Sequence, residues 1–121
     1  MTELIATLGE GKGSWKHVQE IISKQEWEGI FLVTNPFGAE KFFMEGKKIT
    51  FIVIDDRKDI FDLERDIFIQ LKEHVKGMEV AVNFYSGTGK EHMALLPALL
   101  KLGVGMRFIA LKNEQIQELG I

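Results

Sequence analysis

Residues 78–111 read MEVAVNFYSGTGKEHMALLPALLKLGVGMRFIAL, and this stretch decides the fold. The apolar run over 78–84 predicts a strand, because short apolar runs bounded by turn residues are typical of buried strands. A glycine-rich turn follows, and the apolar segment over 90–102 then predicts a helix that stops at Gly103. A last apolar run, 106–111, predicts another strand. A strand, a helix and a strand in this order indicate two parallel strands joined by a crossover.

The same alternation of strands and helices extends upstream to the beginning of the chain. The connection over 35–47 is short, and its part 39–45 forms either a short helix or an irregular crossover, which leaves the direction of the next strand open. Residues 113–119 predict a final helical turn or two. The remaining predicted elements are strands over 3–8, 30–34 and 48–54 and amphipathic helices over 15–25 and 59–75.

This order of elements predicts an α/β fold, a Rossmann-like three-layer sandwich formed by a single domain, residues 1–121. Because right-handed crossovers restrict the topology, we expect a mainly parallel five-stranded sheet in the order 3-2-1-4-5. The first and fourth strands are then neighbours at the point where the chain reverses its direction across the sheet. Ligands of open α/β sheets bind at that switch point, outside the carboxyl ends of the strands.

The composition limits the class of protein. The chain of 121 residues is 45% hydrophobic, which excludes intrinsic disorder. It has no apolar run of the roughly 20 residues that a membrane span needs, and no signal-peptide pattern, so we expect a cytoplasmic protein without a membrane partner. The absence of cysteine excludes disulfides and thiol catalysis, and the three separated histidines predict no metal site and no cofactor. A net charge of −3 argues against long nucleic acids but is compatible with a small anionic ligand.

Two glycine-rich loops follow the first and fourth strands, and the predicted order brings them to one crevice. The first is GEGKGS, residues 9–14, and the second is SGTGK, residues 86–90. Glycine lets backbone amides approach a ligand closely, and the helix N-terminus behind each loop attracts anions. Neither loop has the spacing of a dinucleotide fingerprint or of a Walker A motif. The first loop is therefore either a ligand contact or a turn with a helix cap, in which Ser14 caps the first helix.

Candidate ligand residues come from these loops and their neighbours. Asn35 either bonds a ribose or base edge or starts a turn before proline. His92 either contacts a base or transfers a proton beside the crevice, or is an exposed helix residue. The full set is Gly9, Gly11, Lys12, Gly13, Ser14, Asn35, Ser86, Gly87, Thr88, Gly89, Lys90 and His92.

Several other residues have both a chemical and a structural interpretation. Asp55, Asp56 and Asp59 follow the third strand, where they either hold magnesium or cap the next helix. We favour the caps, since the third strand is expected at the sheet edge, away from the switch point. Trp15 either stacks on an adenine or packs in the core, and burial of its large apolar area favours the core. His17 lies on the same helix, near the crevice.

The second loop and its helix resemble the fourth-strand segment of CARF domains, the CRISPR-associated Rossmann-fold family. Asn83, Gly87 and Thr88 match that family's pattern of Asn-x-[Ser/Thr]-x-Gly-[Thr/Asn]-[Lys/Arg]. Tyr85 stands at the place of the family's Ser or Thr, and Gly89 stands at the place of its basic residue, with Lys90 one position later. The opening LIATLG, followed by a polar glycine loop, is similar to the family's first strand and ligand loop.

The resemblance implies a role in antiviral defence, with a cyclic oligoadenylate or related nucleotide bound across a homodimer. A chain without an effector domain would sense, sequester or degrade this ligand. Degradation would make it a metal-independent phosphodiesterase, with Lys90 as the candidate catalytic residue beside an attacking ribose 2′-hydroxyl.

Two further expectations concern the oligomeric state and the presence of a small ligand. The helical residues Met93–Leu100 are apolar almost all round, and this surplus favours a homodimer independently of any resemblance. The alternative to a nucleotide-binding domain is a Rossmann-like interaction module without a small ligand, because a fold alone does not determine a function.

Overall fold

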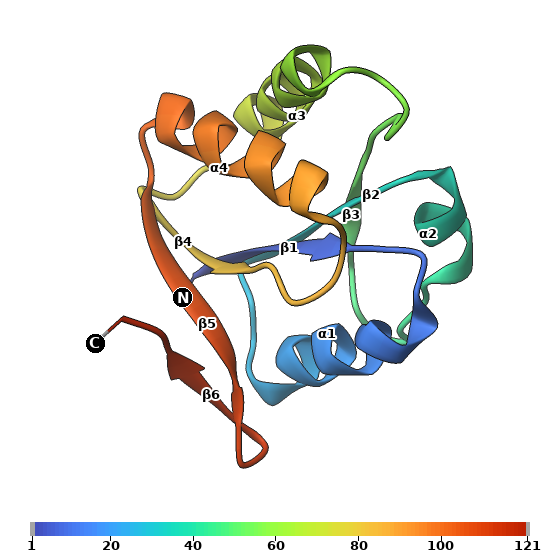
Figure 1. The fold of residues 1–121 in the computed structure, drawn as a ribbon. Helices are drawn as coiled ribbons and strands as arrows, with labels where there is room; N and C mark the ends of the chain where they lie inside the picture. Colours follow the sequence, from blue (N-terminus) through green and yellow to red (C-terminus); the bar gives the residue numbers. More distant parts are fainter. Residues whose placement is uncertain (1, 121) are drawn as a thin grey trace.

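The computed structural model describes residues 2–120 and has the expected α/β architecture (Figure 1). Strands and helices alternate along the chain up to a final hairpin. The elements are β1 (Glu3–Leu8), α1 (Lys12–Lys24), β2 (Gly29–Thr34), α2 (Pro36–Lys41), β3 (Thr50–Val53), α3 (Ile60–His74), β4 (Glu79–Asn83), α4 (Gly89–Leu102), β5 (Gly105–Lys112) and β6 (Gln115–Glu118).

The sheet confirms the predicted strand order and adds one strand to it. Its order is β3-β2-β1-β4-β5-β6, and the first five strands of that order are parallel to one another. β1 lies between β2 and β4, with Leu8 in register with Thr34 and Ala6 in register with Asn83. The carboxyl ends of these three strands therefore meet at one edge, at the switch point between β1 and β4.

Helices cover both faces of the sheet, because the central strands are apolar on both sides. Leu4, Ala6 and Leu8 of β1 pack with the buried residues of α1 on one face. Ile5 packs on the other face, in the cluster that contains the buried residues of α3 and α4. In Figure 1, α3 and α4 lie above the sheet and α1 lies below it. This is the three-layer sandwich that the sequence predicts.

The prediction of helical turns over 113–119 is wrong, since this segment forms the second half of a β-hairpin. β6 pairs antiparallel with β5, with Ile109 opposite Glu118 and Lys112 opposite Gln115. Asn113 and Glu114 form the turn with φ angles of 52° and 63°. Two consecutive residues with positive φ are the backbone of a type I′ hairpin turn, which a helix cannot accommodate. Alternating burial in β6 also fits a strand.

The short connection between β2 and β3 contains a helix, and β3 runs parallel to β2. The Asn35 side chain caps α2 by accepting a hydrogen bond from the Gly38 amide at 3.0 Å, and Pro36 occupies the first turn. β3 is shorter than the predicted 48–54, because only Thr50–Val53 pairs with β2. The direction that the sequence left open is thus parallel.

The predicted cap of the first helix is wrong by three residues. Gly11 is the N-cap of α1, and no described side chain caps this helix. Ser14 lies inside the first turn, where its hydroxyl donates a 2.9 Å hydrogen bond to the Gly11 carbonyl. From this position in the helix, the Ser14 hydroxyl also contacts the hydroxyl of Ser86 in the loop after β4.

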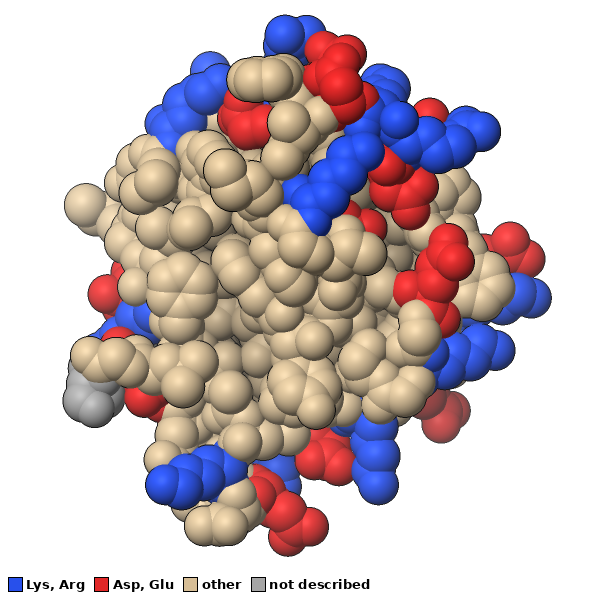
Figure 2. All heavy atoms as spheres, in the orientation of Figure 1, with Lys and Arg blue, Asp and Glu red and all other residues tan. Residues whose placement is uncertain are grey.

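The outer surface of α4 is more apolar than a surface helix requires. Met93 and Leu100 are 64% and 63% exposed, although Ala94, Leu95 and Leu99 are buried against the sheet and α3. Figure 2 shows that charged side chains gather mainly at the rim of this view and leave much of its centre uncharged. No helix within residues 2–120 combines the length and apolarity needed to cross a bilayer.

Candidate ligand cleft

The two glycine-rich loops meet, as the strand order predicts, and Ser86 joins them. Its hydroxyl accepts a hydrogen bond from the Gly9 amide at 2.9 Å and lies 2.6 Å from the hydroxyl of Ser14. Its carbonyl accepts a bond from the Thr7 hydroxyl at the end of β1. Ser86 is 1% exposed; its bond with Thr7 is buried, and its bonds with Gly9 and Ser14 are partly buried. The loops therefore form one rigid rim at the switch point.

Glycine is required at two points of this contact. A Cβ on Gly9 would lie 2.9 Å from the Gly87 amide nitrogen, which only a shift of one loop could relieve. Gly87 has a φ of +91°, a conformation that side chains disfavour. A Cβ on Gly87 would also lie 2.7 Å from Glu91 Oε1 and 3.1 Å from Thr7 Cβ. The glycines thus serve loop packing, whatever else they bind.

The second loop enters α4 through a capping box. The Thr88 hydroxyl accepts the Glu91 amide at 3.3 Å, and the Glu91 carboxylate accepts the Thr88 amide at 2.9 Å. The spacing of Thr and Glu three residues apart is the sequence signature of this motif. It positions Thr88 and Gly87 firmly at the rim of the cleft.

A cleft of about 520 Å³ lies between the loops and holds most of the predicted residues. Lys12, Gly13, Gly89, Lys90 and His92 lie beside the cleft without lining it. Glu10, Tyr85 and Glu91, which were not predicted to bind a ligand, and Asp56, which was favoured as a helix cap, also line it. The predicted residues that line it are Gly9, Gly11, Ser14, Asn35, Ser86, Gly87 and Thr88.

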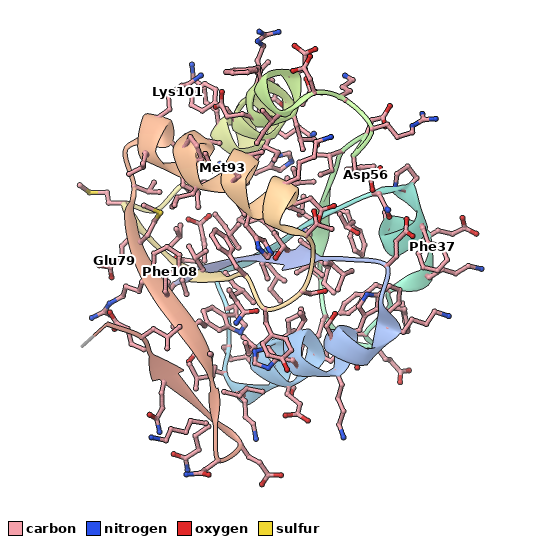
Figure 3. The ribbon with its side chains drawn as sticks, in the orientation of Figure 1. Phe37, Asp56, Glu79, Met93, Lys101 and Phe108 are labelled. Carbon is pink, nitrogen blue, oxygen red and sulfur yellow. The ribbon has the colours of Figure 1, made fainter. Side chains whose placement is uncertain are left out.

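Asn35 connects the two carboxylates of the cleft. Its side-chain amide donates to Glu10 Oε2 at 2.6 Å and to Asp56 Oδ2 at 3.2 Å. The same side chain caps α2 through its oxygen, so its orientation is determined. Asp56 follows the edge strand β3, yet it reaches the cleft, because the end of β2 at Asn35 lies next to it (Figure 3). The expectation that these aspartates lie away from the switch point is therefore wrong for Asp56.

The electrostatic character of the lining differs from that of its surroundings. Among the described residues that line the cleft, Glu10, Asp56 and Glu91 are acidic and none is basic. The Lys90 ammonium donates to the backbone carbonyl of Asp56 at 2.9 Å, and the Lys12 ammonium lies 5.9 Å from the centre of the Phe37 ring. Both predicted lysines thus stand at the periphery, held by contacts within the protein.

The favoured role of a helix cap is confirmed for Asp59 and wrong for Asp55, which bonds Arg57 instead. Asp59 caps α3 by accepting the Asp62 amide at 2.9 Å, and this backbone hydrogen bond lowers the pKa of the Asp59 carboxyl. Asp55 accepts bonds from the Arg57 side chain and amide, which lower its pKa in the same way. Within residues 2–120 no group of three or more acidic or histidine ligands could hold a metal ion.

The aromatic and histidine side chains around the cleft divide into buried and exposed groups. Trp15 is 7% exposed and donates its indole N–H to the Gly9 carbonyl at 2.6 Å, which confirms the core interpretation. His92 stacks on Phe84 and bonds the Ser86 carbonyl at 2.8 Å. His17 stacks on Tyr85, and burial lowers the pKa of its imidazole despite the opposing charge of Glu20.

A second hollow, of about 710 Å³, lies at the opposite, amino edge of the sheet. Glu3 is its buried acid, but the carboxylate already accepts the amides of Lys76 and Gly77, the latter at 2.7 Å. These bonds tie β1 to the turn before β4. The cleft between the loops is the better candidate site, because its polar groups converge at the switch point.

Comparisons with known proteins add no assignment. A scan against models of protein families finds no match to this chain, and a search of curated proteins finds no significant relative. Support for a function therefore comes from the cleft and its residues.

Proposed function

We propose that the cleft binds a nucleotide, most specifically a cyclic oligoadenylate shared between the two subunits of a homodimer. The observation that carries this proposal is the hydrogen-bonded meeting of the two loops through Ser86, at the sheet's switch point. A volume of about 520 Å³ is suited to one nucleotide unit, so a larger ring would extend into a second, symmetry-related cleft. A twofold dimer offers that second cleft.

Different groups around the cleft would bind different parts of the nucleotide. The first turn of α1, which no described side chain caps, and the glycine loop before it offer backbone amides for phosphate oxygens. Glu10 and Asp56 would bind the ribose or the base, because carboxylates accept hydrogen bonds from ribose hydroxyls or from an adenine amino group. Asn35 holds both carboxylates in place for this purpose.

Lys90 and Lys12 act from the periphery. Lys90 would exchange its 2.9 Å bond to the Asp56 carbonyl for a phosphate oxygen, which also offsets the repulsion between the acidic lining and the ligand. If the bound ligand is cleaved, its own ribose 2′-oxygen attacks the adjacent phosphorus in line and forms a 2′,3′-cyclic phosphate as the bond from phosphorus to the 5′-oxygen breaks. The 2′-hydroxyl loses its proton to water, the departing 5′-oxygen takes a proton from water, and Lys90 stabilises the negative charge that develops. The protein then senses, sequesters or slowly degrades the nucleotide.

Titration calorimetry with cyclic tri-, tetra- and hexa-adenylate tests this function, with product analysis of the same samples to detect cleavage. Lys90→Ala should weaken binding by about 1.5–3 kcal/mol, the range for a hydrogen bond to a charged group. Lys24→Ala is a matched control, because Lys24 is exposed in the last turn of α1, at the other end of that helix. No heat of binding with any ring would refute the proposal, as would equal affinities for wild type, Lys12→Ala, Lys90→Ala and their double variant.

The dimer that we propose would cover the apolar surface of α4. Met93 lies on the outer side of α4 (Figure 3). A single exposed apolar side chain is ordinary, but the surface around it is broad and uncharged (Figure 2), which favours a partner. Light scattering at micromolar concentration should give the mass of a dimer, and Met93→Glu should convert it to a monomer. Met78→Glu, at an 88% exposed site before β4, should not. A monomeric wild-type protein would contradict this part.

An interaction module without a small ligand is the second candidate. It is supported by an apolar hollow of about 530 Å³ beside the cleft. The lining comes from β4, the loop after it, β5 and the C-terminal segment, and includes Phe84, Tyr85, Phe108 and Leu119. A protein partner could insert an apolar side chain there. The interaction module becomes the favoured function if calorimetry detects no nucleotide binding by the folded protein.

A further inference from the structure

Tyr85 and His17 form an exposed aromatic stack at the mouth of the cleft. Their ring centres are 3.7 Å apart, and the ring planes differ by 6°. Tyr85 is 62% exposed, whereas His17 is half-buried on α1 behind it. Tyr85 lines both the cleft and the neighbouring apolar hollow. It thus stands at the boundary between a polar site and an apolar surface.

Asn83, a buried residue at the end of β4, contacts the backbone of Tyr85 and the ring of His17. Its side-chain oxygen accepts the Tyr85 amide at 3.2 Å, and its amide nitrogen lies 3.3 Å from His17 Nε2. The same nitrogen donates to the Ile109 carbonyl at 2.8 Å, which anchors Asn83 to β5. Because an amide nitrogen can only donate, this contact is a hydrogen bond when Nε2 of His17 carries no proton. The stack is therefore built into the sheet edge and does not result from two mobile surface side chains meeting.

The other aromatic rings near the cleft are already engaged. Trp15 is buried, and its N–H is bonded to the Gly9 carbonyl. His92 is stacked on Phe84 and tied to the Ser86 carbonyl. Tyr85 alone among the described residues lining the cleft offers an exposed aromatic ring.

We propose that Tyr85, supported from behind by His17, is a stacking platform for the nucleobase of a nucleotide bound in the cleft. The inference rests on the proposed function and assigns the base to this side of the site. A planar base stacks on a tyrosine face at van der Waals distance, and every base has such a face. Phosphate would then lie toward the loops around Ser14 and Ser86, with the base toward β4 and β5.

Two probes that differ only in the base test this assignment: 2-aminopurine riboside 5′-monophosphate and ribose 5-phosphate. The fluorescence of 2-aminopurine is quenched when the base stacks. We expect the wild-type protein to bind the first probe more tightly and to quench it. Tyr85→Phe, which keeps the ring, should retain both properties. Tyr85→Ala and Tyr85→Leu should lose the quenching and about ten- to a hundredfold in affinity for this probe only.

Phe43→Ala is the matched control, because Phe43 is an exposed aromatic residue outside the cleft lining. Circular dichroism checks that each variant is folded. If Tyr85→Ala binds and quenches 2-aminopurine like wild type, the platform is refuted while nucleotide binding stands. Equal affinities of the wild-type protein for the two probes would also refute the platform and leave nucleotide binding standing. If the wild-type protein binds neither probe, the platform for a single base is refuted, and the titrations with the cyclic oligoadenylates decide the proposed function separately.

Discussion

The hydroxyl oxygens of Ser14 and Ser86 lie 2.6 Å apart, although 72 residues separate them in the chain. Ser14 belongs to the first turn of α1, and Ser86 to the loop between β4 and α4. Their contact exists because β1 and β4 are adjacent and parallel, so that both strands deliver their following loops to the same edge. The cleft is a direct product of this adjacency.

Ser86→Ala should lower the free energy of unfolding by about 1–3 kcal/mol, because it leaves the Gly9 amide and the Ser14 hydroxyl without their shared partner. Chemical denaturation monitored by circular dichroism measures the change. Ser23→Ala is the control: Ser23 bonds only the Glu20 carbonyl at an exposed position, and its loss should cost less than about 0.5 kcal/mol. Equal effects of the two substitutions would show that the loop junction contributes no stability.

Gly87→Ala should destabilise the protein more than Gly46→Ala does. Both glycines have positive φ, +91° and +78°, so each substitution carries the roughly 1–2 kcal/mol cost of a left-handed alanine. The Cβ at 46 meets open space, whereas the Cβ at 87 meets Glu91 and Thr7. We expect an additional cost of about 1–3 kcal/mol at position 87. A difference near zero would mean that the loop relaxes freely around the methyl group.

Thr88→Ala should remove half of the capping box of α4 and cost about 1 kcal/mol of stability, whereas Thr88→Ser should stay close to wild type because it keeps the hydroxyl. Thermal unfolding of the three proteins compares them directly. If serine and alanine are equally destabilising, the bond between the Thr88 hydroxyl and the Glu91 amide is not what stabilises this helix end.

Acidification from pH 7.5 to 5.5 should destabilise the folded protein through His17. Burial lowers the pKa of this imidazole, while Glu20 opposes the shift and the facing Tyr85 and Asn83 are uncharged. The unfolded chain consequently binds a proton near pH 6.5 that the folded chain binds only at lower pH, so stability falls as the pH falls through this window.

Urea denaturation at the two pH values measures this effect. His17→Asn should show a smaller loss of stability on acidification than wild type. His74→Asn, which changes an exposed histidine at the end of α3, should keep the wild-type loss. An undiminished loss in His17→Asn would assign the pH dependence to another group.

Local signals in the sequence were enough to predict most of the fold. Apolar runs bounded by glycine predicted strands β1, β2, β4 and β5, and apolar residues at helical spacing predicted α1 and α3, because burial on a sheet selects these patterns. A segment that is apolar almost all round and stops at Gly103 predicted α4. The final hairpin was missed, since residues 113–119 carry no clear period and the turn depends on positive φ at Asn113 and Glu114. Pairing with β5 decided that segment.

The sequence by itself determined that two glycine-rich loops follow neighbouring strands, because strand alternation and crossover handedness leave few topologies. Only the tertiary structure decided what else surrounds them. Asp56 joins Glu10 on Asn35, and Tyr85 stacks on His17, through contacts between residues that no local period relates. A parallel sheet brings the ends of distant strands together, so the composition of its carboxyl edge is set by strand order and register and cannot be read from any one segment.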